Sequence, residues 1–478
     1  MSLLESEKAI IGKLLQNLLR YDAKNTRQWG YYDGEIDIKN IGIAIPHALQ
    51  NVEAILGWPE IVVDSLAERL EWRGWRSAHD TTELSQVFSD NQLDVEVAKA
   101  ILDSLVTGVG FLAATAGDPD KGEPPVLVTA IPPTQATYEW DARLNRMSSG
   151  YVRRIDEKGE ILETLYLPDV TITRQTDTDG RQHVGRTEHH QGCCSLIALP
   201  NRARSGQYRG RSEITPAVRY YTDHGVRTIL GMEYNREIYT TPQKWIKNVW
   251  PEDLGLSEQP SKNELAEYGW QAAMNKALLI PPGGSEDGEA IQTPDVGQFT
   301  AASPAPYIDQ LRMLAQLVAA QAGVPVTYLG FVHDNPPSAD AIRGQEARLV
   351  KRAELRQSSF GQALCQDLAY VCQSIVDGKP ADKAFISSLT SIWRDASMLT
   401  LAVTMDAMFK AVQAGIVPAH SKVVWDRTGF SEAEQEIMLR ELQQQHASMA
   451  LAGLAQAATA ISDSAVGLAK ANREVKDQ

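Results

Sequence analysis

The chain has 478 residues, enough for two to four domains, and 43% of them are hydrophobic, as in ordinary globular proteins. Its formal net charge of −15 excludes a broad basic surface of the kind that binds nucleic acid tightly. No apolar run is long enough to span a bilayer, and Glu5, Glu7 and Lys8 interrupt the first apolar stretch, which excludes a signal peptide. We expect a soluble protein that is not secreted.

The first third of the chain has helical periodicity followed by a strand. Helices are predicted from Ser2 to about Arg20, from Pro59 to Leu70 and from Leu84 to Val106, with a loop over Tyr31–Ile45. Gly108 and Gly110 then precede a short strand, Phe111–Ala114. A dinucleotide site needs its glycines after a strand and before a helix, so this reversed order does not predict a cofactor.

A mostly antiparallel β region follows. The predicted strands are Val126–Ile131, Gly150–Ile155, Ile161–Leu167, Val170–Thr173 and Leu196–Leu199, with turn residues between them. This region contains the one group of residue types that bind metals: His183, His189, His190, Cys193 and Cys194. Zinc sites usually combine two separated ligand pairs, whereas these ligands form a single group with adjacent members. The alternatives are a metal site and, favoured here, an ordinary strand end.

The four cysteines do not form a disulfide framework. Cys193 and Cys194 are adjacent, and Cys365 and Cys372 are seven residues apart on a predicted helix. The second pair is expected to pack as small apolar groups. This usage is typical of a reducing cytoplasm.

Thr215 and Pro216 are typical of a helix start, and the helix is predicted to run to about Tyr239. Gly225 and Gly231 would let a neighbouring helix approach closely. A Pro- and Gly-rich insert follows, with a strand at Ala277–Ile280. It carries Trp245, Trp250 and Trp270, for which two interpretations stay open, a small local core and a docking surface.

Two helices joined by a loop form the most distinctive stretch. The first is Pro304–Gly323, and the second begins near Ser338 and continues to Asp377. A helix of about 40 residues extends about 60 Å, much longer than an average globular helix. The loop between them, Val324–Pro337, ends in Asn335-Pro336-Pro337, which forbids a continuous helix.

The remaining chain is predicted to be mainly helical. One helix covers Trp393–Val412, and a capping box at Ser431 and Glu434 opens another to about His446. The Ala-rich segment Ala447–Ala471 continues as helix, and a frayed tail is the alternative.

The helix, the Pro-Pro loop and the long helix opening NPPSADAIRGQEARLVKRAE resemble the portal proteins of tailed bacteriophages, specifically the Gp6-like group of long-tailed phages. Other stretches are similar to that group in order and spacing: WGYYDGE (Trp29 to Glu35) with Ile45-Pro46, WPEIVVDSLAERLEWRGW (Trp58 to Trp75), LPNRARSGQYRGRSEITPAVR (Leu199 to Arg219) and Pro242-Gln243. The resemblance covers almost the whole chain.

The resemblance implies an α+β portal fold that forms rings. Its parts would be a mixed α/β wing, a two-helix stem, an α/β clip, a long bracing helix and a helical crown. In residue numbers these are an N-terminal wing at 1–212, stem helix 1 at 213–241, the clip at 242–303, stem helix 2 at 304–323, a tunnel loop at 324–337, the long wing helix at 338–380 and the crown at 381–478.

The function implied by the resemblance is architectural. Portal proteins close into a ring, commonly of twelve copies, at one vertex of the capsid, and double-stranded DNA passes through it without sequence specificity during packaging and ejection. The expected partners are the terminase large subunit, then a head-tail adaptor protein, and the major capsid and scaffolding proteins. We expect the protein in the virion, at the portal vertex, and in the host cytoplasm during assembly.

No enzyme motif accompanies this resemblance. Gly12-Lys13 lacks the preceding glycine and the following hydroxyl of a phosphate loop, and no Gly-x-Ser-x-Gly elbow or clear nuclease acid cluster occurs. We therefore predict neither catalysis nor a cofactor, and the energy for packaging would come from another protein.

The resemblance also points to candidate site residues. The tunnel loop would place Tyr328, Phe331, His333 and Asn335 near DNA, and the clip tryptophans named above would dock partners. Basic residues at the start of the long helix are Arg343, Arg348, Lys351, Arg352 and Arg356. They would meet DNA phosphates or, as favoured here, form salt bridges between subunits with Glu346 and Glu354.

Two explanations of the acidic composition stay open. An acidic lumen would repel phosphates and let DNA slide, and many soluble proteins are simply acidic. Two rival classes are a nucleic-acid enzyme and another ring-forming or scaffold protein of the virion. The missing motifs disfavour the first, and the helix, loop and long-helix unit disfavours the second.

Overall fold

The computed structural model describes residues 3–36, 54–240, 244–248, 277–280, 295–298, 300, 303–331, 338–397, 401–430 and 432–474. The chain forms two compact units, Met1–Ala396 and Ser397–Gln478. Among the described residues, no helix has the length and apolarity needed to cross a membrane.

The first helix is longer than the sequence predicts. Helix α1 spans Glu5–Tyr32 and does not end near Arg20, and residues 37–45 of the predicted loop lie outside the described ranges. Its buried face changes from Leu14 and Leu18 to Asn25 and Gln28. These two amides donate to the carbonyl oxygens of Pro133 and Ile214 at 3.0 and 3.1 Å. The hydrophobic pattern therefore stops before the helix does.

Helix α2 (Trp58–Ala67) confirms the second predicted helix, but the third is two helices. Helix α3 (Thr82–Asp90) and helix α4 (Leu93–Thr107) are separated at Asn91 and Gln92, and Gln92 is left-handed with φ 48°. The Asn91 side chain donates to the carbonyl oxygens of Val87 and Val126 at 2.9 and 2.8 Å. This contact with a distant strand fixes the break, which no local signal marks.

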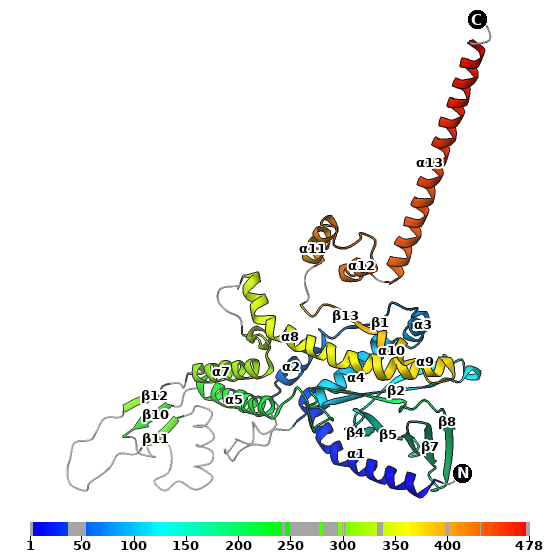
Figure 1. Ribbon diagram of the computed structural model, residues 1–478. Coiled ribbons are helices and arrows are strands. Elements are labelled where there is room, and N and C mark those ends of the chain that lie inside the picture. Colours follow the sequence, from blue (N-terminus) through cyan, green and yellow to red (C-terminus); the bar gives the residue numbers. More distant parts are fainter. Residues whose placement is uncertain are drawn as a thin grey trace, which may run out of the picture. The chain divides into compact units, whose positions relative to one another are not determined.

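Two sheets form most of the β region. One has the order β3-β2-β9, with β2 (Val109–Ala116), β3 (Val126–Ile131) and β9 (Leu196–Pro200), and the short helix η2 (Pro119–Lys121) lies between β2 and β3. The other is an antiparallel meander of β4 (Ala136–Asp141), β5 (Arg146–Ile155), β6 (Ile161–Tyr166), β7 (Val170–Thr176) and β8 (Gln182–Glu188). The predicted strands are confirmed, and β4 and β8 were missed. Helix α1 packs on the meander through Leu14, Tyr151 and Leu165 (Figure 1).

Helices α5 (Pro216–Thr240) and α7 (Ala305–Ala322) lie side by side and confirm both predicted helices (Figure 1). The Thr215 hydroxyl accepts the Val218 N–H at 3.3 Å, as expected of a cap. A Cβ on Gly231 would lie 2.9 Å from the Tyr307 ring, so this glycine permits the close approach. The chain that connects α5 to α7 contains three short strands, β10 (Lys244–Lys247), β11 (Ala277–Ile280) and β12 (Asp295–Gln298). They form a sheet of order β11-β10-β12.

The long helix is confirmed from cap to end. Helix α8 (Ala339–Ala363), the π-helical turn η5 (Leu364–Leu368) and helix α9 (Ala369–Asp377) run continuously (Figure 1). The Ser338 hydroxyl accepts the Ala341 N–H at 3.2 Å, and left-handed Gly378 ends the helix. Cys365 and Cys372 are buried in the core, as the sequence predicts. The π turn was not predicted.

The segment after the long helix returns to the core of the first unit. Helix α10 (Lys383–Ser388) precedes β13 (Thr390–Trp393), which pairs antiparallel with β1 (Trp72–Arg76). The helix predicted from Trp393 is therefore wrong at its start, because Trp393 pairs with Trp72 in this sheet.

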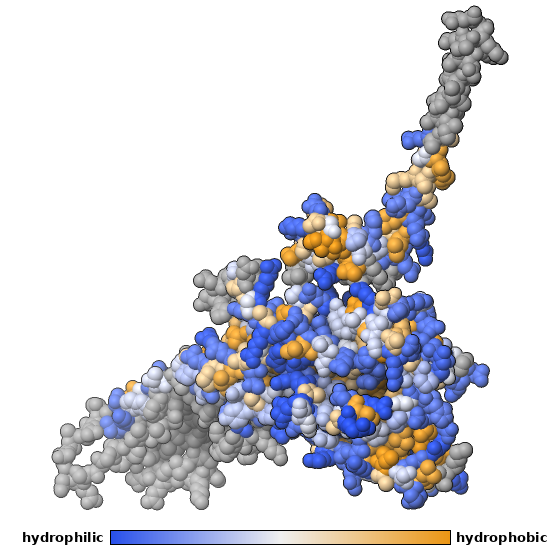
Figure 2. All heavy atoms as spheres, viewed as in Figure 1, coloured by the Kyte–Doolittle hydropathy of each residue, from blue (hydrophilic) through white to orange (hydrophobic). Residues whose placement is uncertain are grey.

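The second unit is helical. It contains α11 (Leu401–Gln413), α12 (Lys422–Thr428) and α13 (Glu432–Glu474). Helix α13 joins the two C-terminal helical segments that the sequence predicts. Apolar side chains remain on the surface of this unit, among them Phe409, Ile416 and Leu451 (Figure 2).

Candidate functional site

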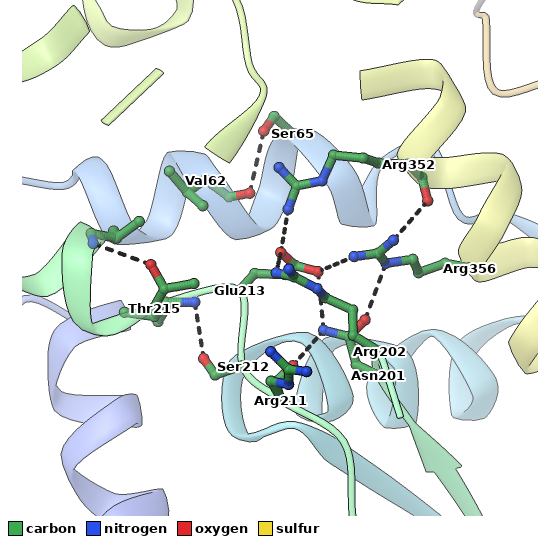
Figure 3. Close-up of polar contacts among 12 residues, drawn as sticks. Val62, Ser65, Asn201, Arg202, Arg211, Ser212, Glu213, Thr215, Arg352 and Arg356 are labelled. Carbon is green, nitrogen blue, oxygen red and sulfur yellow. Dashed lines mark hydrogen bonds and ion pairs between the residues drawn. The ribbon is translucent and has the colours of Figure 1, made fainter. Parts of the chain in front are cut away.

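A buried carboxylate joins the start of α5 to the long helix. Glu213 lies just before α5 and is 2% exposed. Its Oε1 accepts from Arg356 Nη2 at 2.6 Å, and its Oε2 accepts from Arg352 Nη2 (Figure 3). Arg202 Nη1 approaches the same Oε2 at 3.4 Å. Three guanidinium groups thus surround one carboxylate.

This arrangement keeps Glu213 ionised. Burial alone would raise the pKa of its carboxyl, but the charges of Arg352, Arg356 and Arg202 outweigh burial, and the pKa lies below its usual value. A buried charge is tolerated only when it is paired and hydrogen-bonded, which is the situation here.

Asn201 completes the cluster. Its Nδ2 donates to Glu213 Oε1 at 3.1 Å and to the Arg211 carbonyl oxygen at 2.7 Å, and its Oδ1 accepts from Arg356 Nε at 3.1 Å (Figure 3). We call Asn201, Arg202, Glu213, Arg352 and Arg356 the Glu213 node.

The backbone around the node is folded tightly onto α4. The N–H groups of Asn201 and Glu213 donate to the carbonyl oxygens of Gly108 and Leu105, both at 2.9 Å. Gly210 has φ 76°, and a Cβ there would lie 2.2 Å from the Gly108 carbonyl oxygen. The node therefore ties β9, the end of α4, the start of α5 and α8 into one junction.

The predicted basic residues have different surroundings. Arg352 and Arg356 belong to the Glu213 node, within the same chain. Arg348 Nη1 donates to the Ala320 carbonyl oxygen of α7 at 2.9 Å. Lys351 pairs with Glu354 one turn along α8 at 2.8 Å, with both side chains exposed. Arg343 is exposed on the first turns of α8. The structure does not bring the five together.

A second polar cluster lies at the base of the loop that follows α7. Tyr328, in the 3-10 helix η4 (Val326–Leu329), donates its hydroxyl to Glu346 Oε1 at 2.6 Å. Arg69, buried at 4% exposure, donates Nη2 to the Tyr328 hydroxyl at 3.1 Å and pairs with Glu346 Oε2 at 3.2 Å. Its Nη1 donates to the Ala396 carbonyl oxygen at 2.6 Å. Burial, with the nearby carboxylate, raises the pKa of Tyr328.

Of the other predicted loop residues, only Phe331 lies within the described ranges. Phe331 is half-buried and packs against the main core. His333 and Asn335 lie outside the described ranges, so only Tyr328 and Phe331 can be placed. Both lie at the base of the loop.

Of the three predicted docking tryptophans, Trp245 is described and Trp250 and Trp270 are not. Trp245 lies on β10, half-buried, with the Lys247 ammonium 4.5 Å from its ring centroid. A Cβ on Gly297, its cross-strand partner, would lie 2.4 Å from the indole. Trp245 therefore packs over the small sheet.

The histidine and cysteine group does not converge in space. Burial raises the pKa of the Cys193 and Cys194 thiols to about 12, so they are poor metal ligands. His183 and His190 are exposed beside Asp177 and Glu188. Within the described ranges, no cluster of three or more His, Cys, Asp or Glu side chains is arranged to hold a metal ion.

Sequence reasoning missed Glu213, Asn201 and Arg69. Glu213 stands two residues before a helix cap and resembles an ordinary charged residue near a helix start. Its partners on α8 are 139 and 143 residues away, beyond the reach of any local pattern.

Comparisons with known proteins agree on one family. The family model described as "Phage portal protein, SPP1 Gp6-like" matches residues 23–448. The portal protein of Mycobacterium phage L5 is 31% identical over 442 residues, covering 90% of this chain and 86% of that protein. The portal protein of Mycobacterium phage D29 is 30% identical over 433 residues, covering 88% and 85%.

Solved structures that match this chain at low identity come from gene transfer agent particles. A chain in the virion of the native particle has a TM-score of 0.44 at 13% identity, covering 78% of this chain and 90% of that chain. A chain in the neck of the empty particle, computed with C6 symmetry, has a TM-score of 0.45 at 13% identity, covering 77% and 88%.

Proposed function

The chain belongs to the SPP1 Gp6-like family of phage portal proteins, and from this we propose that its copies close into a ring at one capsid vertex, through which double-stranded DNA enters and leaves. The observation that carries the proposal is the family match over residues 23–448, which includes α5, α7 and the long helix. The role is architectural, with no catalytic step assigned to the chain.

A ring that withstands DNA translocation needs stiff subunits. The Glu213 node supports this role, because it fixes α5 to α8 through a buried carboxylate and three guanidinium groups. The continuous helix from α8 to α9 would brace the ring, and α5 with α7 would form the stem around the channel.

The remaining parts follow the same assignment. Residues 1–212 form the wing, 213–241 and 304–323 the stem helices, 242–303 the clip, 324–337 the tunnel loop, 338–380 the long wing helix and 381–478 the crown. Within the last segment, residues 397–478 are the separate compact unit.

The tunnel loop is proposed to project toward the DNA. The contacts of Tyr328 with Arg69 and Glu346 support a fixed base for it. Phe331, His333 and Asn335 would then be presented by the loop, with weak contacts that carry no sequence information. Among the basic residues, Arg343 and Lys351 are exposed and remain proposed for phosphates or neighbouring subunits.

Partners are proposed at both ends of the ring. The clip, with Trp245, Trp250 and Trp270, would dock the terminase large subunit during packaging and a head-tail adaptor afterwards. Major capsid and scaffolding proteins would surround the wing in the virion, and assembly would occur in the host cytoplasm.

The test is direct imaging of the purified full-length chain. Negative-stain electron microscopy with subunit counting in end-on views should show closed rings, commonly of twelve copies, with a hole wide enough for duplex DNA. Compact small oligomers without a channel would contradict the proposal. A monomer should convert to rings when scaffolding protein is added, and failure to convert would count against the ring.

A further inference from the structure

Five cationic side chains gather beside the second half of α1. None of them forms an ion pair with any described residue. We call them the basic stripe: Arg20, Lys24, Arg27, Arg209 and Arg219. The three α1 members succeed one another at steps of four and three residues, so they share one face of the helix. Tyr31 continues that face.

Aromatic rings and neutral side chains contact the stripe: Arg219 Nη1 donates to Gln28 Oε1 at 2.6 Å, and Arg209 Nη1 donates to the Thr137 hydroxyl at 3.1 Å. The Arg209 guanidinium carbon lies 3.8 Å from the Tyr21 ring centroid, and those of Arg27 and Arg219 lie 5.7 and 5.8 Å from the Tyr31 centroid. Burial and the charges of Arg209 and Arg219 lower the pKa of Lys24. Arg209 Nη2 is buried without a hydrogen-bond partner among the described residues. These cations repel one another. Burial and the charge of Arg27 lower the pKa of Arg219, and the nearby Asp223 carboxylate, which accepts from the Tyr31 hydroxyl at 2.9 Å, only partly opposes this.

Five acidic side chains lie at the C-terminal end of α1 and along α2. We call them the acidic stripe: Asp33, Glu35, Glu60, Asp64 and Glu68. The last three are four residues apart along α2 and its C-cap, again one face. Within the described part of the chain none of the five forms an ion pair. Burial and Glu35 raise the pKa of Asp33, and burial with Asp64, Glu60 and Asp33 raises the pKa of Tyr32.

Two adjacent tyrosines separate the stripes. Tyr31 points to Asp223 on α5, and Tyr32 donates its hydroxyl to Asp64 on α2 at 2.9 Å. Successive helical residues point about 100° apart, so the two tyrosines reach different elements. Each stripe alone gathers like charges, which is unfavourable unless an opposite charge covers it.

We propose that the basic stripe of one copy faces the acidic stripe of the next copy in the ring. The inference rests on the proposed ring. A cyclic ring uses two different surfaces on each subunit, and two stripes of opposite sign meet this requirement.

Two facing stripes of opposite charge would attract each other, and this attraction would depend on the salt concentration. Separate exposed ion pairs contribute little, but a network of facing charges contributes more when the interface excludes water. Salt screens such charges within about 8 Å at physiological ionic strength, so ring closure should weaken as salt rises.

The test reverses each stripe separately in the full-length chain. One variant carries Arg20→Glu with Lys24→Glu, and the other carries Glu60→Lys with Glu68→Lys; all four side chains are exposed, so folding should persist. At low ionic strength each variant alone should lose most of its rings. An equimolar mixture should regain them, because every contact between unlike variants then joins opposite charges.

The control for the first variant is Lys121→Glu with Lys158→Glu, which changes the net charge by the same amount at exposed positions away from both stripes. Rings are counted by mass photometry and electron microscopy, and folding is checked by circular dichroism. If wild-type chains form no rings even after scaffolding protein is added, the proposed function fails. If wild-type rings form and both folded variants also form rings as the control does, the inference is wrong. A mixture of folded variants that stays unassembled would overturn it equally.

Discussion

Arg69 and Tyr328, 259 residues apart in the sequence, are joined by a hydrogen bond of 3.1 Å from the guanidinium to the phenol oxygen. The same guanidinium binds the carbonyl oxygen of Ala396, the last residue of the first compact unit. Arg69, which follows α2, thus connects this helix to the base of the loop after α7 and to the end of the first unit. Glu346 on α8 accepts from the Tyr328 hydroxyl and balances the charge of Arg69.

Replacing Tyr328 by Phe should loosen the base of the loop. The change removes the hydroxyl that binds Arg69 and Glu346 and keeps the ring, so the expected loss is about 1 kcal/mol in unfolding free energy. Hydrogen exchange of residues 324–331 should become faster. Tyr370→Phe, which removes a hydroxyl bonded to the Gln191 carbonyl oxygen at 3.0 Å, is the control and should leave these residues unaffected. Unchanged exchange in Tyr328→Phe would show that the cluster does not restrain the loop.

Arg356→Met should be strongly destabilising. It deprives the buried Glu213 carboxylate of the most buried of its three guanidinium partners, and breaking a buried pair costs about 3–5 kcal/mol. Lys351→Met, at an exposed site on the same helix, should change the unfolding free energy by about 0.5 kcal/mol or less. Both are measured by urea denaturation. Adding Glu213→Gln to Arg356→Met should recover part of the loss, and a simply additive double variant would argue against direct coupling.

Acid should weaken the Glu213 node. The pKa of this carboxyl is lower in the folded chain than in the unfolded one, so it contributes stability above the unfolded value of about 4.3. That contribution is lost as pH falls through the lower folded value. Stability curves of wild type and Glu213→Gln should therefore lie far apart at pH 7 and converge below pH about 4. If the difference in unfolding free energy between wild type and Glu213→Gln stayed constant over this pH range, the lowered pKa of Glu213 would be contradicted.

Asp103 should have the opposite effect on the pH dependence of stability: its contribution should become less favourable as pH rises. Burial raises its pKa to about 7, so the ionised carboxylate opposes folding above that pH and the penalty disappears as pH falls toward 4. Asp103→Asn should stabilise the chain at pH 8, by an amount on the order of 1 kcal/mol, and have little effect at pH 4. Thermal denaturation at both pH values measures this. Asp120→Asn, at an exposed turn, should show no such dependence; a gain equal at both pH values would exclude relief of a buried charge.

Gly210→Ala should disturb the junction more than Gly206→Ala. Both glycines are left-handed, with φ 76° and 75°, so each substitution carries about 1–2 kcal/mol of backbone strain. Only at Gly210 would the new Cβ meet backbone oxygens, those of Gly108 and Asn201 at 2.2 and 2.6 Å, because the space around Gly206 is open. The difference between the two melting temperatures measures this contact. If both substitutions lowered the melting temperature equally, the backbone around residue 210 would be able to accommodate the Cβ without a further loss of stability.

Much of the local structure could be predicted because its signals are local. The Ser338 cap, left-handed Gly323 and Gly378, and the apolar lines of α7 and α8 lie within a few turns of the elements they define. Turn residues and alternation located most strands of the meander for the same reason. The order of these segments, with the Asn335-Pro336-Pro337 interruption, also sufficed to identify the family.

Contacts between distant residues were decided only in the folded chain. Helix α1 continues past Arg20 because Asn25 and Gln28 find carbonyl partners on other segments. The break at Asn91 depends on Val126, and the strand at Trp393 exists because β1 lies beside it. The node at Glu213 needs guanidinium groups brought by α8. A sequence pattern records which face of a segment is apolar, whereas pairing of buried polar groups depends on which segments meet, and only the tertiary structure determines that.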